Sequence, residues 1–97
     1  MNMQEVMETE LARMVRENPV APSRVGATKE PHRRAADYSC IYSEAATMYY
    51  ARTMNMKGAE NVLLALCSAR GGCRDNIQQS SNMPENEGYV YAIFELR

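Results

Sequence analysis

The segment YVYAIFEL, residues 89–96, decides the fold class because it alternates in polarity and is rich in β-branched and aromatic residues. This pattern predicts a β-strand with two distinct faces. One face would carry Val90, Ala92, Phe94 and Leu96, and the other would carry Tyr89, Tyr91, Ile93 and Glu95. Because the backbone groups of a strand need hydrogen-bond partners, the segment must belong to a β-hairpin or pair with a strand from elsewhere.

Three partners can satisfy this strand. Residues 74–82 could pair with it as a hairpin across the turn MPENEG, although Ile77 is their only large apolar residue. The connection at residues 20–28 is the second possible partner. Another protein chain is the third.

The remaining sequence predicts three helices, over residues 3–17, 31–56 and 59–70. In the first helix, apolar residues recur at steps of three and four, namely Met3, Val6, Met7, Leu11, Met14 and Val15. The third helix ends at Gly71-Gly72, a common way to stop a helix. Together with the C-terminal strand, these helices predict one small α+β domain over residues 1–97.

The middle helix is expected to lie between two packing partners. Pro31 suits its first turn, where a missing N–H costs nothing. One side of its helical wheel gathers Tyr38, Tyr42, Ala45, Tyr49 and Met56, and the opposite side gathers Ala36, Cys40, Ser43, Thr47 and Ala51. A helix that is uncharged on two opposite sides indicates two partners, one of which is the N-terminal helix or another subunit.

Composition and charge exclude several classes of protein. The formal net charge is -1 over 97 residues, whereas a protein that binds nucleic acid over its whole surface is usually basic. The N-terminus MNMQEVMETELARMV is amphipathic and acidic, unlike a signal peptide, and no apolar run approaches the length of a membrane span. We therefore expect a cytoplasmic protein in which Cys40, Cys67 and Cys73 are free thiols.

The stretch LLALCSARGGCRDN, residues 63–76, invites comparison with the phosphate-binding loop of cysteine phosphatases. In those enzymes an arginine stands six positions after the cysteine, whereas here Cys73 is sixth after Cys67 and Arg74 is seventh. The preceding AENVLLAL also favours a helix over a strand. The sequence therefore favours an ordinary helix end.

Cys67 and Cys73 have further possible roles as a pair. They could form a disulfide, share a metal or carry thiol chemistry, with Arg70 and Arg74 lowering the pKa of Cys73. Their C-x5-C spacing is not that of a zinc site, and the only histidine, His32, is distant in the sequence. We expect no metal and no cofactor.

Basic residues crowd the segment KEPHRRAAD, residues 29–37, at the start of the middle helix. Exposed cations there oppose the helix dipole at a cost of about 0.3–1 kcal/mol each, which a bound anion would offset. The alternative is pairing with the acidic first helix or with Glu85, Glu87 and Glu95. The candidates for partner or anion binding are Lys29, His32, Arg33, Arg34, Arg70 and Arg74.

Tyrosines are the second group of candidate site residues. Tyrosine and methionine are enriched at protein interfaces, and this chain has eight methionines. The alternative is that these rings fill the core. The candidate interface residues are Tyr38, Tyr42, Tyr49, Tyr89 and Tyr91.

These features predict a small non-enzymatic interaction protein, an adaptor or inhibitor that docks on a larger protein and forms a homodimer. The basis is a strand without an evident partner, a helix with two packable sides, and alternating acidic and basic segments. Phage and mobile elements encode many small regulators of this kind. The alternative is a phosphate or nucleic-acid binder that uses the basic start of the second helix, with a tyrosine stacked on a base.

Overall fold

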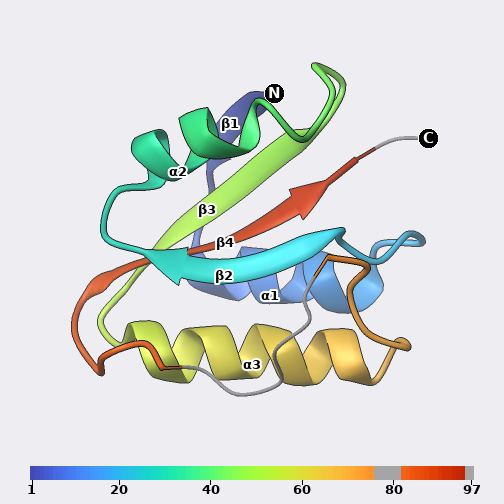
Figure 1. Ribbon diagram of the computed structural model, residues 1–97. Helices are drawn as coiled ribbons and strands as arrows, with labels where there is room; N and C mark the ends of the chain where they lie inside the picture. The colour runs from blue at the N-terminus through green and yellow to red at the C-terminus, as the bar shows by residue number, and fades with distance from the viewer. Residues whose placement is uncertain (76–81, 96–97) are drawn as a thin grey trace.

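The computed structural model describes residues 1–75 and 82–95 and has an α+β fold (Figure 1). The strands of this part of the chain are β1 (Asn2–Glu5), β2 (Arg24–Thr28), β3 (Thr47–Thr53) and β4 (Gly88–Phe94). The helices are α1 (Glu8–Glu17), α2 (Pro31–Tyr38) and α3 (Met56–Ser68). The predicted α+β class with three helices is confirmed. No helix of the described ranges is long and apolar enough to cross a membrane.

The predicted C-terminal strand is confirmed as β4, which lies inside a four-stranded sheet of order β1-β3-β4-β2. It is not part of a hairpin, because it pairs antiparallel with β3 on one side and with β2 on the other. One of the three partners considered, the connection at residues 20–28, therefore supplies a strand. Most of residues 74–82, the hairpin candidate, lie outside the described residues. β4 needs no strand from another chain.

The prediction of a single helix over residues 31–56 is wrong beyond Tyr38. α2 ends there, and after a turn the chain enters β3, with the sequence TMYYART. Its β-branched and aromatic residues favour an extended backbone. β3 lies between β1 and β4 and is covered on both faces, so its apolar residues follow one another without polar alternation. On a helical wheel, a strand of this kind also shows two uncharged sides.

The first predicted helix begins later than expected. Asn2–Glu5 form β1, which is parallel to β3, and α1 starts only at Glu8. The N–H of Asn2 donates to the carbonyl oxygen of Ala46 at 3.0 Å, and that of Val6 to Tyr50 at 2.8 Å. Apolar spacing favours a helix at this point, but tertiary pairing with β3 outweighs the local preference.

The third helix also begins earlier than predicted, at Met56. The side chain of Asn55 caps it by accepting a hydrogen bond from the N–H of Gly58 at 2.9 Å. The helix ends just before Gly71 and Gly72, as the sequence indicated. Both glycines have a positive φ, so they reverse the chain in a conformation that other residues adopt with strain.

Separate cores cover the two faces of the sheet, with α1 and α3 on one face and α2 on the other (Figure 1). The core under α1 and α3 buries Leu11, Val15, Val25, Ala51, Ala59, Leu63, Cys67, Val90 and Ala92. The core under α2 buries Tyr38, Tyr42, Ala46, Met48, Tyr91 and Ile93. Consecutive residues of β4 therefore alternate between the two cores.

Gly26 of β2 lies opposite Tyr91 of β4, and a Cβ at position 26 would come within 2.5 Å of the tyrosine hydroxyl. That hydroxyl is held by Tyr38 at 2.9 Å. We therefore expect Gly26→Ala to lower the free energy of unfolding by about 1–3 kcal/mol, measured by urea denaturation. In a Tyr91→Phe background the loss should be smaller, because the nearest clashing atom is gone. An equal loss in both backgrounds would contradict the steric cause.

Candidate functional site

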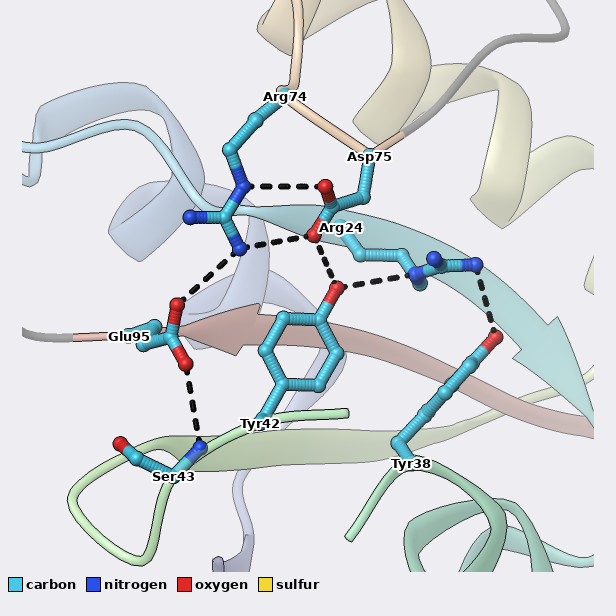
Figure 2. Close-up of polar contacts among 7 residues, drawn as sticks. All are labelled: Arg24, Tyr38, Tyr42, Ser43, Arg74, Asp75 and Glu95. Carbon is cyan, nitrogen blue, oxygen red and sulfur yellow. Dashed lines mark hydrogen bonds and ion pairs between the residues drawn. The ribbon is translucent and has the colours of Figure 1, made fainter. Parts of the chain in front are cut away.

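Most of the predicted site residues lie towards one of two opposite ends of the sheet. One end, where β4 terminates, carries an internal polar network, and the other end carries an open hollow. The network includes Tyr38, Tyr42 and Arg74 (Figure 2). The hollow is lined in part by Lys29, His32, Arg33 and Tyr89.

Arg24 of β2 lies at the centre of the network, and the sequence analysis did not single it out. Its guanidinium carbon lies 4.7 Å from the centroid of the Tyr38 ring. Its Nε donates to the Tyr42 hydroxyl at 3.1 Å, and its Nη1 donates to the Tyr38 hydroxyl at 3.4 Å. The hydroxyl of Tyr38 shares a 2.9 Å hydrogen bond with that of Tyr91. All three tyrosines are buried within the chain.

Arg74 and Asp75 extend this network to the loop after α3 (Figure 2). Arg74 contacts the Asp75 carboxylate at 3.0 Å and the Glu95 carboxylate at 3.1 Å. Asp75 also accepts a hydrogen bond from Tyr42, and Glu95 accepts one from the N–H of Ser43 at 3.2 Å. Arg74 holds the pKa of Asp75 below its usual value. Burial and the hydrogen bond to Asp75 raise the pKa of Tyr42.

These contacts give several of the predicted residues hydrogen-bond or ion-pair partners within the chain. Arg70 likewise donates to the carbonyl oxygen of Val15 at 2.8 Å. Tyr49 is half-buried, with its ring 5.9 Å from that of Phe94. The predicted partner or interface residues that have internal polar partners are Tyr38, Tyr42, Tyr91, Arg70 and Arg74. Their contacts favour a structural role at this end of the sheet.

We name the hollow at the opposite end the strand-end groove. It has a volume of about 500 Å³ and is lined by Glu5, Lys29, Glu30, Pro31, His32, Arg33, Tyr50 and Tyr89. β1, β2 and β3 all point towards this end, since β1 is parallel to β3 and both β2 and β3 are antiparallel to β4. The carboxyl ends of strands are a frequent location for binding sites in open α/β sheets.

Aromatic rings follow one another along the groove. The ring of His32 lies 6.1 Å from that of Tyr50, which lies 5.8 Å from that of Tyr89, both edge to face. Burial and the nearby Glu5 raise the pKa of Tyr50. Tyr50 and Glu5 are not among the predicted site residues, because both fall in segments predicted to be helices, residues 31–56 and 3–17. The available signal was the β-branched and aromatic composition of TMYYART.

Positive and negative charges nearly balance in and beside the groove. Arg33 pairs with Glu30 at 3.4 Å, and Arg52 pairs with Glu87 at 3.0 Å. Lys29 makes no ion pair with residues 1–75 or 82–95. The first turn of α2 has no side-chain cap. A carboxylate or phosphate would therefore find both a free ammonium group and free N–H groups here.

Two other predictions concern residues outside the groove. Arg34, the fourth basic residue of the segment, is half-buried and does not line it. Cys67 is buried in the last turn of α3, so it does not lie on a phosphate-binding loop that follows a strand. The described residues contain no group of three or more side chains that could hold a metal ion.

β1 leaves part of its backbone open at the edge of the sheet. Asn2 and Val6 direct their N–H groups to β3. Peptide groups alternate along a strand, so the N–H and C=O of Met3 and Glu5 point away from the sheet. Glu5 also lines a second hollow of about 550 Å³ with Val6, Met7, Glu8 and Arg52. The open edge therefore adjoins both hollows.

Asp75→Asn tests the internal network. Because Arg74 lowers the folded-state pKa of Asp75, the carboxylate stabilises the fold above its unfolded pKa, and this contribution is lost as pH falls through the folded value. We expect the variant to have a lower thermal midpoint at neutral pH and to lose less stability than the wild type below about pH 5. Circular dichroism measures both. Asp37→Asn, on the exposed surface of α2, is the matched control, and identical behaviour of the two variants would refute the role of Asp75.

The chain was also compared with known protein families, with curated proteins and with solved structures. Function must be inferred from its own residues, since none of the three comparisons gave a match.

Proposed function

We propose that this protein is a small non-enzymatic interaction protein that docks on a larger protein by accepting an extended segment of that partner beside β1. The observation that carries the proposal is the open backbone of Met3 and Glu5 next to the strand-end groove. In strand addition, main-chain hydrogen bonds provide affinity and flanking hollows provide specificity. The adaptor or inhibitor role predicted from the sequence is kept, but its basis moves from β4 to β1.

The groove favours an acidic residue in the partner segment. Lys29 has no ion pair among the described residues, and the uncapped first turn of α2 offers free N–H groups. A carboxylate that enters the groove would interact with both. The rings of Tyr50 and Tyr89 offer apolar surface beside it. At the second hollow, Met7 is 73% exposed and suits an apolar residue of the partner.

The mixture of charges favours a protein partner over a polyanion. Arg33 and Arg52 already pair with Glu30 and Glu87, which reduces the positive charge available to successive phosphates. Charges of both signs around tyrosine and methionine side chains are typical of protein interfaces. The partner segment is therefore expected to be extended and to alternate acidic with apolar residues.

Met3→Pro tests strand addition at β1. The substitution removes the N–H that points away from the sheet and leaves the hydrogen bonds between β1 and β3 in place. Position 3 lies on an edge strand, where proline is tolerated. Met3→Ala is the matched control, since it also removes the methionine side chain but keeps the N–H. For a peptide selected by the wild type from a random display library, we expect Met3→Pro to weaken binding at least about tenfold relative to Met3→Ala. Fluorescence anisotropy measures this difference.

The same peptide allows strand addition to be tested by changing the partner's backbone instead of the protein's. N-methylation of its backbone at alternate positions should abolish binding to the unaltered protein, which keeps the test valid if Met3→Pro fails to fold. Equal binding by the proline and alanine variants, or by the methylated peptide, would overturn strand addition. Selected peptides that lack acidic residues would overturn the proposed partner chemistry. Light scattering also measures whether the protein is a dimer. If it is, and if Met3→Pro dissociates the dimer, the segment beside β1 comes from a second copy of this chain rather than from a larger partner.

Phosphate or nucleic-acid binding is the second candidate function. It is favoured by one observation, which is that Lys29, His32 and Arg33 line a single groove together with Tyr89. The rings would stack on bases while the cations contact phosphates.

This second candidate predicts that a labelled single-stranded oligonucleotide binds at low salt and is released as salt rises. Lys29→Ala should then weaken retention on a filter, whereas Lys57→Ala in α3 should not. The protein-docking proposal predicts no retention of the oligonucleotide even at low salt. Filter binding at two salt concentrations therefore separates the two functions.

A further inference from the structure

Cys67 and Cys73 lie together at the end of α3, far along the chain from the proposed docking edge. Cys67 is only 2% exposed and belongs to the core under α1 and α3. Cys73 packs against the same core but is partly exposed. The two thiols interact electrostatically, so their side chains lie close together.

The backbone between the two cysteines makes this approach possible. Gly71 and Gly72 have φ angles of +92° and +89°, in the left-handed region that favours glycine. The N–H of Gly72 donates to the carbonyl oxygen of Cys67 at 2.7 Å. The chain therefore turns back on the last turn of α3 and brings Cys73 against Cys67.

We propose that Cys67 and Cys73 form a thiol–disulfide exchange pair, which a small disulfide such as oxidised glutathione converts into an intramolecular disulfide. The thiolate of Cys73 first attacks one glutathione sulfur, forming a mixed disulfide and releasing a glutathione thiolate. The sulfur of Cys67 then attacks Sγ of Cys73, and the second glutathione leaves with the proton of Cys67. In total, the protein dithiol and one oxidised glutathione give the protein disulfide and two reduced glutathiones.

Cys73 is the attacking thiol for electrostatic and steric reasons. The interaction with the Cys67 thiol and the nearby guanidinium of Arg70 lower the pKa of Cys73. The interaction with Cys73 and burial raise the pKa of Cys67. Arg70 is fixed in place by the carbonyl oxygen of Val15. Cys73 is also the more exposed of the two, so it meets the oxidant first.

Disulfide formation would act on the polar network of Figure 2. The loop that begins at Cys73 continues directly into Arg74 and Asp75, which contact Glu95 and Tyr42. A covalent link from Cys73 to α3 would restrain this loop. Oxidation should therefore slow amide hydrogen exchange in the loop and leave exchange in β1 unchanged.

Alkylation and mass spectrometry test the proposal on the wild-type protein. Samples equilibrated in mixtures of reduced and oxidised glutathione are quenched with N-ethylmaleimide in denaturant, so that the buried Cys67 thiol also reacts, and their intact masses are measured. The reduced chain should take up a maleimide on each of its three cysteines, and the oxidised chain should take up one, mapped to Cys40. A fully labelled chain at every ratio, or a disulfide that includes Cys40, would overturn the proposal.

Single variants test the roles of the two thiols. Cys67→Ser should retain a glutathione adduct on Cys73, because the resolving thiol is absent. Cys73→Ser should form no adduct on the buried Cys67, and Cys40→Ser should form the disulfide normally. The opposite distribution of adducts would refute the assigned order. If Cys67→Ser does not fold, early quenching of the wild type should still find the mixed disulfide on Cys73, and early adducts on Cys67 would refute the order.

Discussion

β4 hydrogen-bonds to a neighbouring strand along both of its edges, and the rest of the fold depends on this arrangement. β3 and β4 carry apolar side chains on both faces, so both faces are shielded from water. α1 and α3 cover one face, and α2 covers the other. The glycine at position 26 lets the Tyr91 side chain lie flat across β2, so the smallest residue of one strand accommodates a large ring of the next. No further chain is needed to complete this layer.

Local sequence signals identified the elements whose form does not depend on distant contacts. The alternation in residues 89–96 indicated β4, and Gly71-Gly72 marked the end of α3. Where a segment is buried on both sides, these signals fail. The sequence of β3 predicts a helix because its Met48 and Ala51 belong to cores on opposite faces. The sequence of β1 also predicts a helix, since only its pairing with β3, more than forty residues away, makes it a strand.

The residues of the candidate site also divide into those that the sequence brings together and those that only the folded structure brings together. Lys29, His32 and Arg33 are close in sequence, so their proximity could be predicted, and they do line one groove. Tyr50 and Glu5 join them only through the sheet. Arg74, Tyr38 and Tyr42 have the composition of a binding surface, but burial and the partners Arg24 and Asp75 direct them inwards. Residue type alone does not distinguish a polar side chain that is hydrogen-bonded inside the protein from one that faces a ligand, because both need hydrogen-bonding groups.

The position of β4 also affects how the molecule can assemble. It is the last of the seven elements in the part of the chain that the structure describes, yet β2 and β3 are neighbours of β4 and not of each other. A nascent chain that has not yet released residues 88–94 from the ribosome therefore holds the β1–β3 pair and the single strand β2, which have no strand between them. Folding must wait for insertion of the final strand between them, a non-local step of the kind that slows folding. Until β4 is inserted, the unpaired edges of β2 and β3 expose the chain to aggregation.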